Sequence, residues 1–420
     1  METTNTVLNP LNTKFVVWDA MMSSGKTQRI IQTMIAEHKP TSFFGATPEK
    51  FMYISPYLDE AHRIAGTTPI TGDDAKRPKL DADGKVIYSD VPQKDLQFCH
   101  PSNSNKDGSK VTGLKYLIEN SANIVSTHTL FKSLSCLDVP NIENYTLVID
   151  EALEVLEYDL TFTNAEIEQF FKINLLSLDA DGKTVRFHKE NFGRAGKGVD
   201  STENTQYEQF ANDCAKGLVY KVKKRLIRKF DATLLYKFKR VIIMTYNYKG
   251  SMFDLVLQQA GINPEIEYFG KTVADVKPLI KINMDEKMNA VGVARNPKNM
   301  VKDGKFPTLT STYFKKDAEG KKVAYPEINK FFYNKLYNMW LQREKVAVER
   351  RLWTCFKPDM MEISKGTGKT NRFSSQWLAY NTKATNDYDQ TDHLAFLVNA
   401  YVAPDFVLVL TWNGIKFNQD

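Results

Sequence analysis

The segment AMMSSGKT, Ala20–Thr27, has the composition of a loop that binds phosphate groups. It follows the apolar run KFVVW and leads into a stretch with helical spacing of apolar residues, which is the strand–loop–helix order that a P-loop requires. Backbone N–H groups at the start of a helix bind phosphate oxygens. We therefore expect a nucleotide's phosphates to be held by six consecutive residues: Met22, Ser23, Ser24, Gly25, Lys26 and Thr27.

Two side chains at the end of this loop suit a magnesium nucleotide. Lys26 supplies a positive charge to the β- and γ-phosphates, and the Thr27 hydroxyl is a natural Mg²⁺ ligand. Ala20 stands where the simplest pattern has glycine, and it is tolerated because the closest backbone approach comes later, at Gly25. The alternative is a serine-rich turn that contains GKT by chance.

A second GKT occurs in KGTGKT, Lys365–Thr370. Ile363 occupies the position of the first glycine there, and no apolar strand directly precedes the segment. We interpret it as a basic loop.

Two carboxylates follow a strongly apolar run, because YTLVIDEALEV places Asp150 and Glu151 directly after YTLVI. In an open α/β sheet, ligands bind beyond the carboxyl ends of the strands. Asp150 would hold Mg²⁺, often through water, and Glu151 would polarise the attacking water. Acids commonly follow strands, so the pair alone is weak evidence. Together with Ala20–Thr27 it predicts a nucleoside triphosphatase.

These residues are positioned by short apolar runs that alternate with helical patterns. Strands are predicted at 14–18, 51–55, 123–126, 145–150 and 239–245, with helices after the first and the last. Helical crossovers between strands predict an α/β fold with a mostly parallel sheet.

A second alternating series begins near residue 276. It contains a predicted helix around 326–345, then the segments RLWTCF and SQWLAYN, a predicted helix at 392–401 and a strand-like run at 406–412. We place the boundary near Gly270–Lys277, which gives domains 1–273 and 274–420. Polar stretches near 71–110 and 189–206 are predicted to be surface insertions in the first domain.

Composition excludes several classes of protein. The 420 residues are 42% hydrophobic and 25% charged, as in soluble globular proteins of two or three domains. The longest apolar runs are too short for a bilayer, and the N-terminus lacks a signal-peptide pattern. The four cysteines form no CxxC pair, so we expect no zinc site or disulfide framework and a cytoplasmic protein. The net charge of +6 permits an anionic partner.

Several motifs resemble those of superfamily 2 helicases. DEAL, Asp150–Leu153, is similar to their DEAD/DEAH box. YISPYLDEAHRI (Tyr53–Ile64) and STHTLF (Ser126–Phe131) resemble the segments with which those helicases contact a nucleic-acid strand. MTYNYKGS, Met244–Ser251, occupies the place of the motif that couples the ATP and nucleic-acid sites. The second half, with FSSQWLAYNTKATNDY and LAFLVNAYVAP, resembles the second motor domain of phage-encoded members.

This resemblance implies two RecA-like domains of the P-loop NTPase class. ATP and Mg²⁺ would lie between them, and DNA, single-stranded or forked, would cross both. Catalysis would use Lys26, Asp150 and Glu151, with Thr27 and Asp150 on the metal. Strand contacts would come from Pro56, Tyr57, Ser126, Thr127, His128, Asn381 and Thr385, and coupling from Thr245, Tyr246 and Asn386. A phage-encoded helicase of this kind acts in DNA replication or recombination in the host cytoplasm.

One element of the family is missing. Superfamily 2 helicases carry a late motif whose arginines reach the γ-phosphate, on a helix that follows a segment resembling WNGIKFNQD, where this sequence ends. Arg350, Arg351 and Arg372 all precede NTKATN. An arginine finger is worth roughly 10³–10⁵ in rate. We therefore expect a truncated chain, a protein partner that supplies the arginine, or a helicase fold that binds or anneals nucleic acid with weak or no ATP turnover.

KVKKRLIRKF, Lys221–Phe230, predicts a basic helix. Contact with phosphates and an ordinary solvated surface remain equally open for it. Bases stack on aromatic side chains in single-strand sites, but most aromatics pack in cores. The candidates for stacking that flank the contact motifs are Tyr53, Tyr57, Tyr246 and Tyr248, with Trp377 near NTKATN.

Other P-loop enzymes also carry loops like MMSSGKT. Thymidine kinases are much shorter and usually carry zinc-binding cysteines, and a phage packaging motor needs a nuclease domain with clustered acids. The sequence shows neither feature convincingly.

Overall fold

A computed structural model describes most of the chain. The described residues are 13–38, 48–65, 96–101, 110–136, 139–194, 205–282, 327–365, 373–380, 382, 388, 390–398 and 402–417. They fall into two compact units. The first comprises Met1–Val273 together with Ala403–Asn418, and the second comprises Ala274–Val402.

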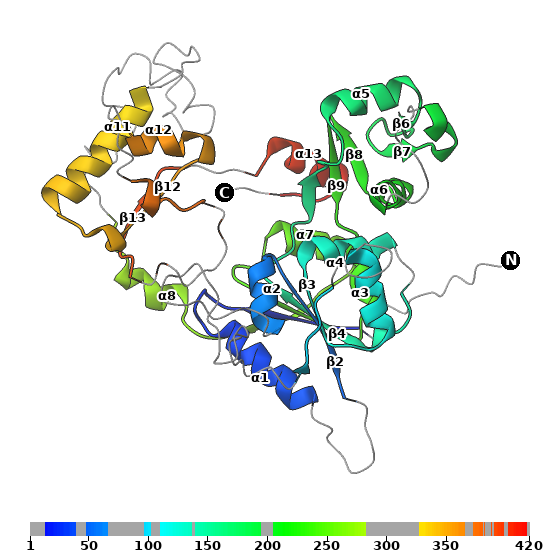
Figure 1. The fold of residues 1–420 in the computed structure, drawn as a ribbon, viewed down its shortest axis with the longest axis horizontal. Helices are drawn as coiled ribbons and strands as arrows, with labels where there is room; N and C mark the ends of the chain where they lie inside the picture. The colour runs from blue at the N-terminus through cyan, green and yellow to red at the C-terminus, as the bar shows by residue number, and fades with distance from the viewer. Residues whose placement is uncertain are drawn as a thin grey trace, which may run out of the picture. The chain divides into compact units, whose positions relative to one another are not determined.

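A six-stranded parallel sheet forms the centre of the first unit (Figure 1). Its spatial order is β11-β1-β10-β4-β2-β3, and all neighbouring pairs are parallel. The strands are β1 (Lys14–Asp19), β2 (Lys50–Ser55), β3 (Ile124–Thr127), β4 (Tyr145–Asp150), β10 (Arg240–Thr245) and β11 (Glu265–Tyr268). The predicted α/β class and all five predicted strands are confirmed. The edge strand β11 was not predicted.

Helices cover both faces of this sheet. Val16 and Trp18 point to one hydrophobic cluster, while Val17 between them points to the other, which is the period-two alternation of a strand. α1 (Lys26–His38) and α2 (Leu58–Ala65) pack on the Trp18 face. α3 (Lys110–Glu119), α4 (His128–Lys132) and α7 (Met252–Gln259) pack on the Val17 face.

The segment between β4 and β10 forms an insertion with its own core. It contains β5 (Leu156–Tyr158), α5 (Asn164–Lys172), β6 (Leu176–Leu178), β7 (Val185–Phe187), α6 (Thr205–Ala215), β8 (Val219–Val222) and β9 (Arg225–Lys229). Three phenylalanines, Phe162, Phe170 and Phe210, are buried together with Leu226 in its core. Short 3-10 helices flank these elements at Lys189–Arg194 and Ala232–Lys237.

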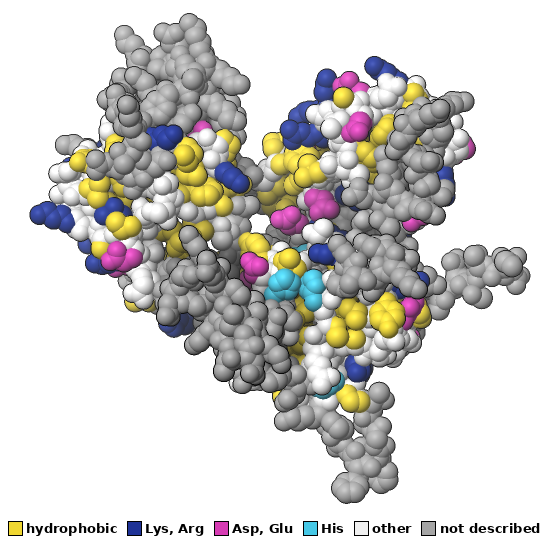
Figure 2. Space-filling view, viewed as in Figure 1, with side chains coloured by type: hydrophobic (Ala, Val, Ile, Leu, Met, Phe, Trp, Pro, Cys, Tyr) yellow, Lys and Arg dark blue, Asp and Glu magenta, His cyan; other side chains and the backbone are white. Residues whose placement is uncertain are grey.

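The predicted basic helix over Lys221–Phe230 is wrong, because β8 and β9 form an antiparallel hairpin there. Lys223 sits at its turn with a φ of +55°. Val222 and Leu226 are four residues apart, which suits one face of a helix, but the same two residues also fit on two paired strands. The segment forms strands because β9 pairs with β5 as well as with β8. Figure 2 shows Lys and Arg among Asp and Glu over the region of α5, and Lys224 pairs with Glu168 at 3.0 Å.

The predicted insertion near 71–110 needs a partial correction. Leu96 and Phe98 are buried in the core beside α1 and α2, and Cys99 forms a bridge to Ile124 on the edge strand β3. Residues 71–95 lie outside the described residues. Of the stretch 189–206, only the ends are described.

The second unit has a small parallel pair of strands, β12 (Arg351–Thr354) and β13 (His393–Phe396). α11 (Glu327–Leu336) continues as a π-helix over Tyr337–Arg343, and α12 (Met360–Lys365) follows β12. Trp340 and Trp353 are fully buried in its core. The long helix around 326–345 is confirmed, and the segment RLWTCF contributes the strand β12. The helix predicted at 392–401 is wrong, because His393–Phe396 pairs with β12.

The apolar segment near the C-terminus is a helix and not the predicted strand. α13 (Pro404–Trp412) packs on the first unit, where Val409 and Leu410 join the core. Its Phe406 ring lies 4.8 Å from that of Tyr158. The predicted domain 274–420 therefore differs from the structure, which groups Ala403–Asn418 with the first unit. Within the described ranges, no helix combines the length and apolarity that crossing a bilayer requires.

Candidate active site

The predicted phosphate loop and the acidic strand end meet at the same edge of the sheet. β10 lies between β1 and β4, with Asp19 opposite Thr245 and Met244 opposite Asp150. Since neighbouring strands lie about 4.8 Å apart, the last residues of β1 and β4, Asp19 and Asp150, have backbones about 10 Å apart. This is a span that a magnesium ion with its bound phosphate and side chains can bridge.

The phosphate loop has the backbone shape of a tight turn into a helix. Ser23 and Gly25 have φ angles of +59° and +77°, and α1 begins at Lys26. The Lys26 ammonium is buried and donates to the carbonyl oxygens of Ala20 and Met21, at 2.6 and 3.2 Å. Burial lowers the pKa of Lys26, while the charges of Glu151, Asp150 and Asp19 oppose that shift. The structure thus brings Lys26 within electrostatic range of all three carboxylates.

Asp150 is hydrogen-bonded to residues of two neighbouring elements. The Tyr53 hydroxyl on β2 donates to its Oδ2 at 2.8 Å. The imidazole Nε2 of His128 lies 2.9 Å from its backbone carbonyl oxygen. Burial raises the pKa of Asp150 to about 6, and the bond from Tyr53 partly opposes that shift. Glu151 has a φ of +64°, and its N–H donates to the carbonyl of Met244 at 2.8 Å.

The segment after β10 is bonded to the base of the phosphate loop. Asp19 is buried and accepts from the N–H groups of Asn247 and Tyr248, at 2.8 and 3.0 Å. The Ala20 N–H donates to the carbonyl of Thr245 at 3.0 Å. Thr245 is buried and Tyr246 is exposed. The predicted coupling residues Thr245 and Tyr246 therefore lie beside the loop.

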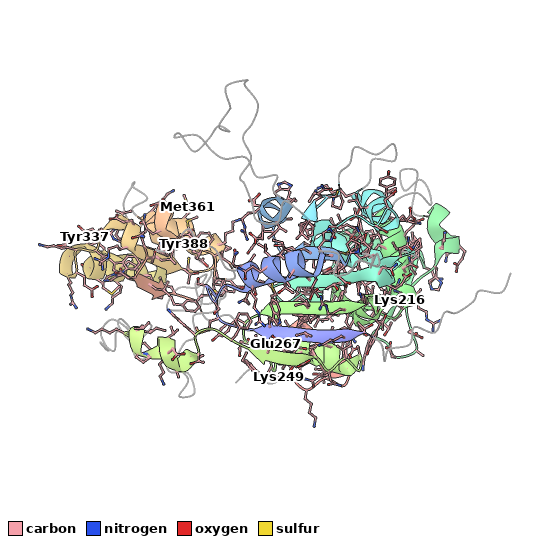
Figure 3. All side chains as sticks on the ribbon, turned by 90° about the horizontal axis from the view of Figure 1, so that it is seen from below. Lys216, Lys249, Glu267, Tyr337, Met361 and Tyr388 are labelled. Atoms are coloured by element: carbon pink, nitrogen blue, oxygen red, sulfur yellow. The ribbon has the colours of Figure 1, made fainter. Side chains whose placement is uncertain are left out.

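The turn after β11 touches the other side of the loop. A Cβ atom added to Gly270 would lie 2.7 Å from the Cβ of Ser24. The Arg29 guanidinium on α1 lies 4.3 Å from the Trp18 ring and 4.4 Å from the Phe269 ring. Arg29 also binds Glu267 on β11 at 2.8 Å, and Figure 3 labels Glu267 on this edge strand. These contacts fix the loop between β1 and the edge of the sheet.

Sequence reasoning missed four residues of this site: Asp19, Tyr53 as a partner of Asp150, Arg29 and Gly270. The position of Asp19, directly before the loop, was a usable signal. The other three depend on which strands are neighbours.

The residues present fit a magnesium nucleotide. Thr27 is partly buried at the start of α1, and Asp150 and Glu151 supply carboxylates opposite Lys26. Within the described part of the chain, no three His, Cys, Asp or Glu side chains gather in a way that would hold a metal ion. A Mg²⁺ ion here would need phosphate oxygens as further ligands, which is how Mg²⁺ is usually bound beside nucleotides.

The predicted strand-contact residues divide into exposed and buried ones. Tyr57 is exposed and Pro56 is partly exposed. Ser126 is fully buried, His128 is nearly so, and Thr127 caps α4 by accepting from the N–H of Leu130 at 3.3 Å. Tyr53 and Tyr248 are also fully buried, so neither is available for stacking on a base. Asn381, Thr385 and Asn386 lie outside the described residues.

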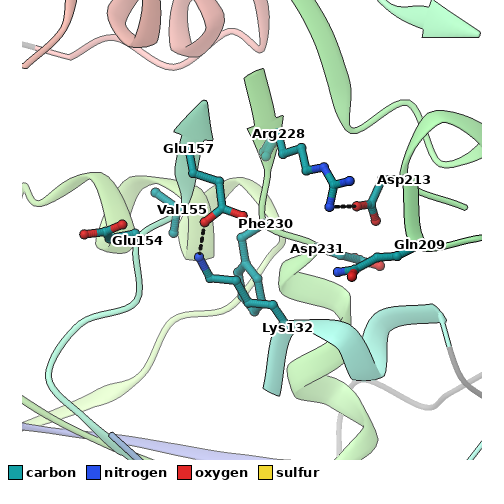
Figure 4. Close-up of a pocket in the computed structure, with 10 residues that line it drawn as sticks. Lys132, Glu154, Val155, Glu157, Gln209, Asp213, Arg228, Phe230 and Asp231 are labelled. Carbon is teal, nitrogen blue, oxygen red and sulfur yellow. Dashed lines mark hydrogen bonds and ion pairs between the residues drawn. The ribbon is translucent and has the colours of Figure 1, made fainter. Parts of the chain in front are cut away.

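A charged pocket lies at the base of the insertion (Figure 4). Lys132 pairs with Glu157 at 2.7 Å, and Arg228 pairs with Asp159 at 2.5 Å and with Asp213 at 3.5 Å. Each of these two cations is therefore already paired with a carboxylate. A groove of about 740 Å³ beside it is lined by Tyr158, Leu160, Phe406 and neighbouring residues. Neither cavity is lined by the phosphate loop.

Comparison with known proteins gives three findings. Residues 274–420 match the family model of the YonV C-terminal Rossmann-like domain. The chain is 26% identical over 416 residues to the SPbeta prophage-derived uncharacterized protein YonV of Bacillus subtilis strain 168, covering 96% of this chain and 88% of that protein. A solved structure, XPD_APO, aligns with a TM-score of 0.47 and 13% identity over 97% of this chain and 86% of its own. The relative is described as prophage-derived, and the family model is consistent with an α/β second unit.

Proposed function

We propose that the protein is an ATP-hydrolysing motor of the superfamily 2 helicase type that acts on DNA. One observation carries this proposal. Lys26 begins the helix that follows β1, and Asp150 and Glu151 stand at the end of β4, so both groups lie at the carboxyl edge of one sheet with β10 between the two strands. In this proposal, that edge of the first unit would supply a cation for the phosphates and carboxylates for a metal ion and a water molecule.

Each group has a chemical role in this proposal. A nucleotide would displace the Lys26 ammonium from the carbonyls of Ala20 and Met21, because a triphosphate offers a stronger charged acceptor than two carbonyls. Thr27 and Asp150 would hold Mg²⁺, which offsets the charge of the phosphates. Glu151 would orient the water that attacks the γ-phosphate. Nucleic acid would contact the first unit through the segments that include Pro56, Tyr57 and Thr127.

A second candidate is a protein that binds ATP and DNA with little turnover. Two arginines of the second unit have structural partners. Arg350 binds Asp392 through two nitrogens, and the buried Arg351 donates to the carbonyl of Val346. Arg350 would have to leave a carboxylate, and Arg351 a backbone carbonyl, before either arginine reached a phosphate. A partner protein that supplies an arginine is the other route to fast hydrolysis.

ATP hydrolysis by the purified chain, with and without single-stranded DNA, tests the proposal. We expect turnover that DNA stimulates, and Lys26→Ala is expected to reduce it about 100-fold or more, as loss of one transition-state donor does. Lys115→Ala, which removes an exposed lysine on α3, is the matched control and should leave turnover unchanged. Stimulated turnover in Lys26→Ala equal to wild type would refute the proposal. Binding of ATP and DNA without multiple turnovers would favour the second candidate.

The prophage origin of the YonV relative supports a further part of the proposal. We assign this chain to DNA replication or recombination of a phage in its host's cytoplasm. Deletion of the gene from a phage that encodes it should reduce phage DNA synthesis, measured by quantitative PCR after infection.

A further inference from the structure

Asp150 is hydrogen-bonded to one residue in each of two predicted strand-contact segments. Tyr53 begins the segment Tyr53–Ile64 and donates its hydroxyl hydrogen to Oδ2 of Asp150 at 2.8 Å. His128 lies in the segment Ser126–Phe131, with its Nε2 at 2.9 Å from the carbonyl oxygen of Asp150. A carbonyl accepts only, so Nε2 must carry the proton.

Both contacts are protected from water. Tyr53 is 0% exposed and His128 is 8% exposed, and hydrogen bonds are electrostatically stronger in such surroundings than in water. Each bond joins the end of β4 to an element that leads directly to the surface. The strand of Tyr53 leads to the exposed Tyr57, directly before α2, and His128 is the first residue of α4.

The segment that carries His128 also contains an unsatisfied polar group. The Ser126 hydroxyl is fully buried and has no hydrogen-bond partner among the described residues. Leaving such a group unpaired costs about 1–3 kcal/mol. A shift of Ser126–His128 that satisfies this hydroxyl would therefore recover free energy, and the same shift would move the His128 imidazole relative to the Asp150 carbonyl.

We propose that Tyr53 and His128 are positioning residues that couple DNA binding to the orientation of Asp150. The Tyr53 hydroxyl holds Oδ2 of Asp150, which would leave Oδ1 available to a metal ion, and the His128 imidazole holds the backbone carbonyl of the same residue. A strand bound over α2 and α4 moves these two holders together, and Asp150 moves with them. The inference rests on the proposed function, because it presupposes that magnesium nucleotide and DNA both bind the first unit.

Coupling between two sites is reciprocal, so it can be measured by binding alone. The probe is a fluorescein-labelled oligothymidylate, and the quantity is the ratio of its Kd without and with Mg²⁺ and a non-hydrolysable ATP analogue. Coupled sites typically change affinity about 5–150-fold. We expect such a ratio in the wild type, and a ratio near one in His128→Leu and in Tyr53→Phe.

Two further variants separate coupling from packing. His128→Gln keeps an N–H donor for the Asp150 carbonyl and should retain the wild-type ratio. Tyr145→Phe removes a different buried tyrosine hydroxyl, on β4. That hydroxyl donates to the Ala122 carbonyl at 2.7 Å and not to Asp150, so this variant should also retain the ratio.

Four outcomes would overturn the inference. An unchanged ratio in both His128→Leu and Tyr53→Phe shows that the two bonds do not couple the sites. Equal losses in Tyr145→Phe or His128→Gln show a general packing effect. A wild type that binds nucleotide and DNA independently refutes the coupling and leaves the proposed function standing, whereas a wild type that binds no nucleotide refutes both.

Discussion

Replacement of Gly270 by alanine tests how closely the turn after β11 supports the phosphate loop. Gly270 has a φ of +77°, and a Cβ atom there would lie 2.7 Å from Ser24 Cβ and 2.8 Å from Ser24 Oγ. Carbon atoms in contact prefer separations of about 3.5–4.0 Å. The added methyl group must therefore displace Ser24, or its own turn, by about 1 Å.

Two separate costs add up in this variant. A left-handed backbone costs an alanine about 1–2 kcal/mol, and an extra methyl group in a packed site costs about 1–3 kcal/mol more. The second cost falls on the loop whose N–H groups would hold the phosphates. A displacement of about 1 Å in an active site can reduce the reaction rate about 100-fold. We therefore expect Gly270→Ala to weaken ATP binding at least about tenfold and to reduce ATP turnover further.

Gly182→Ala is the matched control. Gly182 has a φ of +68°, and no described atom lies within 4 Å of its added Cβ, so only the backbone cost applies, on the insertion. ATP affinity is measured with a fluorescent ATP analogue, and thermal unfolding is followed for both variants. If Gly270→Ala binds ATP as tightly as Gly182→Ala does, the contact between this turn and the loop is wrong.

Two predictions concern stability. Leu410→Ala should lower the free energy of unfolding of the first unit by about 2–5 kcal/mol, because the Leu410 side chain is 1% exposed in the core of that unit. Leu408→Ala on the same helix should change the free energy of unfolding little, because Leu408 is 40% exposed. Equal effects of the two variants in urea unfolding would contradict the docking of α13. Burial raises the pKa of Asp213 to about 6 from 3.8, so the folded state holds the proton more tightly than the unfolded state does. As pH rises from about 4 to 6, the free energy of unfolding of the wild type should therefore fall relative to that of Asp213→Asn, by at most about 3 kcal/mol. A difference between the two that does not change with pH would show that this carboxyl is not buried as described.

The sequence was a good guide where local patterns decide structure. The five apolar runs became strands because their residues must be buried on both faces of a parallel sheet. The loop before Lys26 and the acids after β4 were recognisable for the same reason, since each stands directly after such a run. Helical spacing after Ser251 likewise predicted α7.

Short apolar segments were ambiguous, because the same residues fit a strand or a helix. Phe406–Trp412 became a helix because it covers the core of the first unit, and the segment near Lys221 became a hairpin because β5 lies beside it. In each case the partner is distant in the chain.

By itself, then, the sequence determined the class of the first unit, the order of its strands along the chain and the residues suited to phosphate and metal chemistry. Only the tertiary structure decided that β10 separates β1 from β4, that Tyr53 and His128 hold Asp150 and that Gly270 touches Ser24. The physical reason is range. Hydrophobic periodicity and turn geometry act between residues near in sequence, whereas strand order and buried hydrogen bonds are set by packing between segments that the sequence keeps far apart.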